Sequence, residues 1–491
     1  MTYTSSVDDI RNGISVHNSS GYVMAAQPAT SSTVDVNEVL GDRKIGFFQV
    51  NLLFWAFIAM LADGFDMQTM PYVASSILNA FHVERAAFGP VFSASFIGVL
   101  VGAPVLGVLG DHFGRKTGVI VSLLICALFM LVTMTATSLN QLMIYRFLTG
   151  IGIGGAFPNV AALVVEFSPK RTRAAFVIIS IFGLAFGTML PGYVATSLVP
   201  THGWQVVFLV GGILPIVVVA CLIFGLPESI KYLALRDKQS AVAKIVRRLD
   251  PTLPIGPNTR FVVASAVRRP AISPALLFSP GLAAITILIW IICFLNLSTS
   301  FMFASWVPVL LQGQGVSLAQ ASSVVALFFM GGVLGGLVHL FTIDKYGALP
   351  IMIMFLLAVP MIASFGLVAA GSTEMIALAF GAGSCMMGAQ YGINALPGLI
   401  YPTAIRGNGA GWAQAIGRAG SSLGPIIGGL LVGMKLPNEY FFLAPAAGLL
   451  LGAVAAFLLM TECVRKFGSY RLEEETVDKV APIPIPTAVN V

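Results

Sequence analysis

Long apolar runs alternate with short polar stretches along almost the whole chain. Each run has about 20 residues or more, which is enough for a helix to cross the ~30 Å hydrocarbon layer of a membrane. The runs form two sets of six, separated by one long polar segment. They lie near 46–79, 88–109, 117–136, 141–165, 174–199 and 205–226, and then near 282–311, 318–342, 349–370, 374–400, 409–433 and 439–461. The pattern predicts an all-α membrane protein with twelve transmembrane helices.

The polar segments predict how the chain is divided around these spans. Residues 1–44 are rich in Ser and Asn and lack an apolar core and a cleavage site, which favours a disordered cytoplasmic arm over a signal peptide. Two six-helix halves are expected at 45–226 and 281–461, joined by a basic linker at 227–280. Residues 462–491 are charged and then Pro-rich, and they predict a disordered tail.

Composition excludes a soluble enzyme. Hydrophobic residues make up 57% of the 491 residues and charged residues only 10%, against ~25% in a typical soluble domain. So little charge could not cover the surface of a soluble protein of this size, so lipid must surround most of the chain. A transmembrane β-barrel would need alternating apolar and polar residues, and the unbroken apolar runs exclude it.

The basic residues predict the orientation of the chain in the membrane. With the N-terminus inside, the cytoplasmic loops and tails hold 23 Lys and Arg, and the opposite face holds only Arg85 and Lys435. Cytoplasmic loops of membrane proteins carry an excess of Lys and Arg, so both termini are expected in the cytoplasm. The net charge of +6 therefore reflects orientation and not nucleic-acid binding.

Two motifs recur in the second half at one offset. GDHFGRK at 110–116 follows the second span, and IDKYGA at 343–348 follows the eighth. Asp111 of the first motif lies 233 residues before Asp344 of the second. This match alone indicates that the second half repeats the first.

The other motif gives the same offset independently. PKRTR at 169–173 follows the fourth span, PTAIR at 402–406 follows the tenth, and Arg173 lies 233 residues before Arg406. Both copies of each motif lie on the cytoplasmic side, so the two halves are expected to be related by an axis along the membrane normal. This is the plan of the major facilitator fold, which has its substrate site at the midplane between the halves.

The loop GVLGDHFGRK at 107–116 resembles the signature loop of the major facilitator superfamily. Gly107 and Gly110 are expected to let helices approach closely. The basic residues of the loop are expected to pair with acids or carbonyl groups as the halves rock; a plain positively charged loop is the alternative. The residues expected to form the gate are Gly107, Asp111, Gly114, Arg115, Lys116, Arg146, Glu166, Arg173, Asp344, Lys345 and Arg406.

Further segments resemble the aromatic acid/proton symporters, a bacterial family within that superfamily. They are LADGFDMQTMPYV at 61–73, RFLTGIGIGGAFPN at 146–159, EFSPKRTRA at 166–174, LPESIKYL at 226–233, SWVP at 305–308 and a long match within 390–429. The first-span match and the match from the tenth to the eleventh span are the specific ones. The resemblance implies import of an aromatic carboxylate together with a proton.

The sequence departs from this family at three places. After Asp66 it reads MQTMPYV where the family more often has small residues, and Phe301 stands where Tyr is expected. These two departures leave the exact aromatic acid open. The fifth span keeps only Pro191 and Gly192 of an exporter motif, which favours uptake.

Asp63 and Asp66 are the acids that lie well inside an apolar span, among 21 in the chain. A carboxylate at bilayer depth is costly unless it is paired or faces water, and such residues are often functional. The two are three residues apart on one helix, so they are expected to share a face, where both cannot ionise cheaply. We expect them to carry the proton; a structural pair at Gly64 is the alternative.

Two Arg residues also lie inside spans. Arg418 is expected to hold a substrate carboxylate, because a guanidinium group binds carboxylates through two parallel hydrogen bonds. Pairing with an acid, or snorkelling to the membrane surface, are the alternatives for Arg418. Arg146 is expected to pair with Asp63 or Asp66, or to position the gate.

Polar and aromatic residues of the second half complete the predicted substrate site. Gln390 and Asn394 lie on one helix face, where they can orient carboxylate or hydroxyl groups or bond a neighbouring helix. Asp63 plus the offset of 233 gives Asn296, so a neutral amide is expected at matching depth in the seventh span. Trp306 and Trp412 are expected either to stack on an aromatic ring or to anchor at the membrane surface.

The sequence therefore predicts a monomeric carrier that imports an aromatic carboxylate, such as a hydroxybenzoate used in catabolism, together with a proton. Two alternatives remain: a major facilitator carrier of another organic acid, a sugar or a drug, and a substrate sensor built on a transporter scaffold. The chain shows no nucleophile–base set and no cofactor loop, and its five His are scattered, so neither catalysis, a cofactor nor a metal is expected.

Overall fold

The computed structural model describes residues 33–36, 45–169, 172–249, 256, 259–263, 274–279, 281–402 and 405–468. Most of the predicted arm and tail, and much of the predicted linker at 227–280, therefore lie outside the described residues. Arg268 and Arg269 of the linker are among these.

Twelve long helices make up most of the described chain. The first half contains α2 (Phe47–Phe81), α3 (Phe88–Phe113), α4 (Arg115–Thr133), α5 (Leu139–Phe167), α6 (Arg173–His202) and α7 (Gln205–Gly225). The second half contains α10 (Ala283–Gly313), α11 (Leu318–Tyr346), α12 (Leu349–Phe365), α13 (Thr373–Ile400), α14 (Arg406–Gly433) and α15 (Asn438–Phe467). Eleven of them are long and apolar enough to cross a membrane, and α12 is a shorter apolar helix. The prediction of an all-α membrane protein is confirmed.

Serine side chains mark where several helices begin. The hydroxyl groups of Ser138, Ser317 and Ser372 accept hydrogen bonds from backbone N–H groups in the first turns of α5, α11 and α13. These N–H groups have no partner within the helix, so a serine cap stabilises the start of each one. α12 ends at Phe365 and is followed by Gly366 as its C-cap. The apolar run had predicted a span that continues to residue 370.

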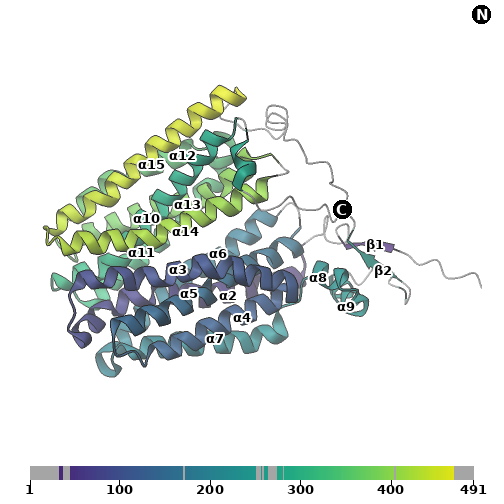
Figure 1. The fold of residues 1–491 in the computed structure, drawn as a ribbon, viewed down its shortest axis with the longest axis horizontal. Coiled ribbons are helices and arrows are strands. Elements are labelled where there is room, and N and C mark those ends of the chain that lie inside the picture. The colour runs from purple at the N-terminus through teal and green to yellow at the C-terminus, as the bar shows by residue number, and fades with distance from the viewer. Residues whose placement is uncertain are drawn as a thin grey trace, which may run out of the picture.

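The two halves repeat the same helix pairs and lie side by side (Figure 1). In the first half α2 packs on α6, α3 on α5 and α4 on α7; in the second half α10 packs on α14, α11 on α13 and α12 on α15. The halves meet where α3 contacts α14 and where α6 contacts α11, which are equivalent pairs under the repeat. The duplication that the motif offset predicts is therefore present in the packing.

The halves touch at one end and separate towards the other. A Cβ atom on Gly429 of α14 would lie 3.0 Å from Cα of Gly89 in α3, so the two helices are in close contact there. Further along the same helices, a Cβ on Gly107 or Gly411 would meet nothing within 4 Å. In Figure 1 the halves diverge towards the end that carries α8 (Ile230–Leu235) and α9 (Gln239–Leu249). The prediction that Gly107 brings helices together is thus wrong for this conformation.

A small unit of short helices and strands lies beside the diverging ends. It contains α8, α9 and two parallel strands, β1 (Thr33–Asp35) and β2 (Arg260–Val262), in which Val34 is opposite Phe261. Val36 and Phe261 are buried in the same apolar cluster as Val242 and Val246 of α9. The disorder predicted for residues 1–44 therefore does not hold for 33–36. Short 3-10 helices, η1 (Arg85–Ala87) and η2 (Pro274–Phe278), precede α3 and α10.

Candidate functional site

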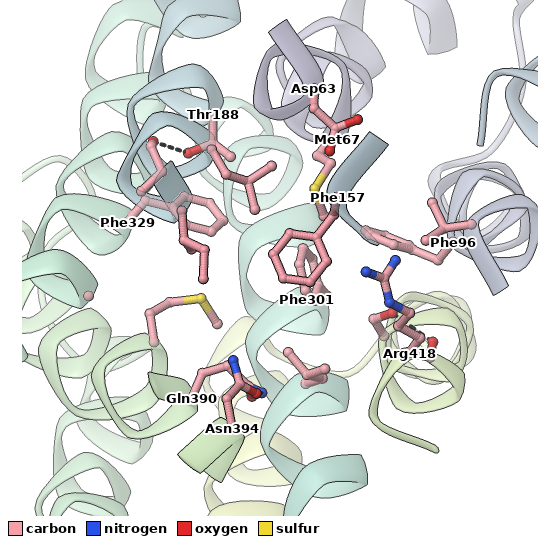
Figure 2. A pocket seen from close by; sticks show the side chains of 18 of the residues that line it. Asp63, Met67, Phe96, Phe157, Thr188, Phe301, Phe329, Gln390, Asn394 and Arg418 are labelled. Carbon is pink, nitrogen blue, oxygen red and sulfur yellow. Dashed lines mark hydrogen bonds between the residues drawn. The ribbon is translucent and has the colours of Figure 1, made fainter. Parts of the chain in front are cut away.

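A cavity of about 180 Å³ lies between the two halves, halfway along the spans. It is lined by α2, α3, α5 and α6 of the first half and by α10, α11, α13 and α14 of the second. Its walls are largely apolar and include Met387. Other apolar wall residues are Met67, Phe96, Phe157, Phe301 and Phe329 (Figure 2). Its polar lining residues are Asp63, Thr188, Gln390, Tyr391, Asn394, Gln414, Arg418 and Ser421.

Asp63 and Arg418 approach the cavity from opposite halves (Figure 2). Asp63 is 2% exposed, and its Oδ1 atom has no hydrogen-bond partner among the described residues. The guanidinium carbon of Arg418 lies 6.0 Å from the centre of the Phe157 ring. The charges of Asp63 and Arg418 interact across the cavity, but no ion pair of 4.0 Å or less joins these two described residues. Arg418 therefore has hydrogen-bond donors left for an anion in the cavity.

Asp66 has a different environment, since it forms a buried ion pair with Arg146. Nη1 of Arg146 lies 2.6 Å from Oδ1 of Asp66, and Nη2 lies 2.9 Å from Oδ2. Both side chains are 1% exposed. Residues three apart on a helix differ by about 60° in direction. That angle is enough to turn Asp63 to the cavity and Asp66 into the core of the first half, where the sequence predicted one shared face.

Asp66→Asn should destabilise the protein, because it leaves the guanidinium of Arg146 buried without a counter-charge. Breaking one partner of a buried pair typically costs about 3–5 kcal/mol. Thermal unfolding of the purified protein in detergent measures the loss. The double variant Asp66→Leu with Arg146→Met should recover most of it, because neither charge is then buried. Equal stability of Asp66→Asn and wild type would contradict a tight pair.

Four amide side chains form a connected network at the cavity wall. Nδ2 of Asn296 donates to Oε1 of Gln390, and Nε2 of Gln390 donates to Oδ1 of Asn394, both at 2.7 Å. Nε2 of Gln414 donates to the same Asn394 oxygen at 2.7 Å. Asn296 is fully buried and reaches the cavity only through Gln390. Sequence reasoning missed Gln414, although its spacing of four residues from Arg418 places both on one face of α14.

The two tryptophans expected at the substrate do not line this cavity. Trp306 is fully buried, donates from Nε1 to the Pro425 carbonyl at 2.9 Å, and packs on Phe92. Trp412 lies beside Trp290, with ring centres 6.1 Å apart. In this conformation Trp306 joins α10 to α14, and Trp412 packs on the start of α10.

The signature loop joins helices of the first half. Asp111 and Arg115 form an ion pair, and Nη1 of Arg115 donates to Oδ1 of Asn159 at 3.2 Å. Asn159 is buried and also donates to the Leu106 carbonyl at 3.1 Å. A Cβ on Gly110 would collide with the Asn159 side chain, so Gly110 does provide the close approach that the sequence predicted.

Two glutamates attach α8 to the ends of the spans. Glu228 accepts a hydrogen bond from the backbone N–H of Lys116 at 3.0 Å, and its carboxylate fills the space next to Gly114, which has a φ of 106°. Glu166 accepts from Oγ of Ser229 at 2.7 Å and from the backbone N–H of Lys231 at 2.9 Å. These contacts all join the first half to the start of the linker, so they do not join it to the second half.

The two copies of each motif differ in their contacts. Asp344 and Lys345 are exposed and form no hydrogen bond or ion pair with the described part of the chain. Nε of Arg406 donates to the Tyr401 carbonyl at 3.4 Å, whereas Nε of the half-buried Arg173 has no hydrogen-bond partner in the part of the chain that the structure describes. The two halves therefore share their packing but differ in their gate contacts.

Comparison with known proteins agrees with this architecture. The family profile described as Major Facilitator Superfamily matches residues 52–313 and 289–474. The chain is 33% identical to a gallate transporter of Pseudomonas putida, over 84% of this chain and 92% of that protein. It is 32% identical to the 4-hydroxybenzoate transporter PcaK of Pseudomonas aeruginosa, over 86% of this chain and 96% of that protein. The partially occluded inward-open xylose transporter XylE of E. coli has a similar fold, with a TM-score of 0.64 at 18% identity, over 84% of this chain and 98% of that one.

Proposed function

The chain belongs to the Major Facilitator Superfamily, and on that basis we propose that it imports an aromatic carboxylate together with a proton, as a monomer. It is a multi-pass protein of the inner membrane and a transporter, not an enzyme. Two relatives that are more than 30% identical to it are named as transporters of gallate and of 4-hydroxybenzoate. Both names support the proposed class of substrate.

The single observation that carries the proposal is Arg418 in a cavity with aromatic walls. Apolar cavities of about 150 Å³ hold one benzene ring, so a cavity of about 180 Å³ suits a single-ring acid. Phe96, Phe157 and Phe301 offer ring faces and edges to the aromatic ring. Arg418 offers the planar donor pair that a carboxylate needs.

The position of Asp63 supports coupling to a proton. When Asp63 is ionised, its charge competes with a substrate carboxylate for Arg418, because both interact with the same cation. When Asp63 is protonated, Arg418 is released to bind the substrate. Proton and substrate then bind most favourably together, which is the thermodynamic requirement for symport. We assign the proton to Asp63, and we assign Asp66, with Arg146, to holding α2 in the position that presents Asp63.

The conformation supports alternating access with the open end towards the cytoplasm. The basic helices α8 and α9 lie at the diverging ends, and basic segments of membrane proteins face the cytoplasm. β1 pairs with β2 of the linker, so the chain before the first span lies on the same side. The hydrogen bonds of Glu228 and Glu166 are proposed to make these ends of the first half move as one body.

A pair of spin labels, attached at Gly107→Cys and Gly411→Cys in a protein that lacks the exposed Cys221, should show two label-to-label distances, one for each conformation. Both positions face open space, so they tolerate a side chain. The shorter distance should gain population when substrate is added, because closing this end brings α3 and α14 together. A control pair, Gly107→Cys and Lys231→Cys, should keep one distance, because α8 is hydrogen-bonded to the first half. One distance for Gly107→Cys and Gly411→Cys under all conditions would contradict alternating access.

A ligand screen tests the substrate class directly. Thermal unfolding of the purified protein should shift upwards with benzoate or hydroxybenzoates, because a ligand that binds only the folded state stabilises it. Xylose and nicotinate serve as comparison ligands. A shift with xylose alone would overturn the proposal and favour a sugar carrier.

A further inference from the structure

Gln414 and Asn394 lie side by side in the wall of the cavity. Resting on the proposed function, we propose that Gln414 and Asn394 form a subsite that recognises a hydroxyl group on the substrate ring. The carrier then selects hydroxylated aromatic acids over the unsubstituted acid. Asn296 and Gln390 act as positioning residues for this subsite.

Within the amide network, Asn394 leaves a donor group unused and Gln414 leaves an acceptor unused. Oδ1 of Asn394 accepts from both Gln390 and Gln414, so the amide of Asn394 must point its oxygen at them. Its Nδ2 then has no partner among the described residues. Gln414 donates through Nε2, and its Oε1 accepts nothing there. A phenolic hydroxyl is both a donor and an acceptor, so it can donate to Gln414 Oε1 and accept from Asn394 Nδ2.

The hydrogen bonds of the network tie the directions of these amides together. Rotating the Asn394 amide alone by half a turn would set its NH₂ group against the NH₂ groups of Gln390 and Gln414. Gln390 can rotate with it only if Asn296 rotates too, because the Gln390 oxygen accepts from Nδ2 of Asn296 at 2.7 Å. Asn296 is fully buried in α10, and its Oδ1 has no hydrogen-bond partner among the described residues. In either common direction of the amides, Asn394 and Gln414 together present one donor and one acceptor.

The subsite lies at a useful distance from the carboxylate site. Gln414 and Arg418 leave the same face of α14 about 6 Å apart along its axis, which is comparable to the length of a substituted phenyl ring. Figure 2 shows Arg418 and the pair Gln390 and Asn394 at different sides of the cavity, with Phe301 between them. A ring held against Phe301 can therefore place its carboxylate at Arg418 and a ring hydroxyl at the amides.

A site built to bond a hydroxyl group rejects a ligand that lacks it, because its own polar groups are then left unpaired. Two hydrogen bonds of ordinary strength correspond to a preference of about 10- to 100-fold. The preference belongs to the amides and not to Arg418, since both ligands carry the same carboxylate. Removing one amide should therefore lower the preference for the hydroxylated acid.

Calorimetry on the purified full-length protein tests this with benzoate, 3-hydroxybenzoate and 4-hydroxybenzoate. Wild type should bind at least one hydroxybenzoate about 10- to 100-fold more tightly than benzoate. Gln414→Met should reduce that ratio to near one, because the variant has no amide left to prefer the hydroxylated acid. Asn296→Leu should lower the ratio in the same way, while Asn296→Ser, which keeps a donor, should restore part of it. Thr188→Val is the matched control, because the Thr188 hydroxyl lines the same cavity but is bonded to Ala185.

The outcomes separate this inference from the proposed function. If wild type binds benzoate and both hydroxybenzoates equally, the subsite is overturned and the aromatic carboxylate carrier stands. If Gln414→Met keeps the full preference, the subsite is also overturned. Asn394→Leu provides the same comparison if Gln414→Met does not fold. Binding of none of the three acids overturns the proposed function together with the subsite.

Discussion

Asp63→Asn should abolish accumulation of substrate under an inward proton gradient. The amide has nearly the shape of the carboxyl group, but it cannot bind and release a proton. The proton gradient therefore cannot drive accumulation of the substrate. Binding should persist, because the neutral amide resembles the protonated carboxyl group in leaving Arg418 to the substrate. Uptake of labelled 4-hydroxybenzoate into proteoliposomes, with and without a gradient, measures the effect.

The same proteoliposomes contain the control for this prediction. Exchange of labelled for unlabelled substrate needs no net proton movement, so Asp63→Asn should keep exchange while it loses accumulation. Loss of both activities together with loss of binding would point to a damaged site. Normal accumulation by Asp63→Asn would show that the proton is carried elsewhere.

Arg418→Ala should weaken substrate binding by about 2–4 kcal/mol, the range expected when charge-assisted hydrogen bonds to a carboxylate are removed. Arg418→Lys should lose less, because the ammonium group keeps the charge but cannot form two parallel bonds. Calorimetry with 4-hydroxybenzoate measures both losses. Because Arg418 also interacts with the charge of Asp63, the variants should be compared again in the Asp63→Asn background.

A neutral analogue separates charge from shape in this experiment. 4-Hydroxybenzamide has the same ring and hydroxyl group but no negative charge, so its affinity should change little between wild type and Arg418→Ala. An equal loss for the acid and the amide would mean that Arg418 only supports the cavity wall. Equal affinity of wild type and Arg418→Ala for the acid would remove Arg418 from the substrate site.

The spans and the duplication were predictable because lipid imposes simple rules on sequence. A helix that crosses the membrane must be apolar over a fixed length, and the runs near 46–79 and 282–311 correspond to α2 and α10. The shared offset of Asp111–Asp344 and Arg173–Arg406 anticipated the equivalent helix pairs. The strand at 33–35 was not predictable, because its partner lies more than two hundred residues away in the chain.

The site was predictable in its chemistry and less so in its geometry. Asp63 and Arg418 stand out because charged residues are rare inside spans, and both line the cavity. The separation of Asp63 from Asp66 depends on how α2 is rotated against α5, which spacing along one helix does not determine. A Trp residue inside a span suggested a contact with an aromatic substrate. The indole of Trp306 instead joins α10 to α14 by a hydrogen bond. Gln414 could have been predicted from the sequence, because it lies four residues before Arg418 and therefore on the same helix face.

The most direct test of the central claim is substrate accumulation by wild type in proteoliposomes under an imposed proton gradient. With the outside acidic, labelled 4-hydroxybenzoate should rise inside above its external concentration and fall back when a protonophore dissipates the gradient. Proton entry, followed with a dye inside the vesicles, should accelerate when substrate is added. Substrate entry that stops at equal concentrations on both sides and brings no protons with it would contradict the account.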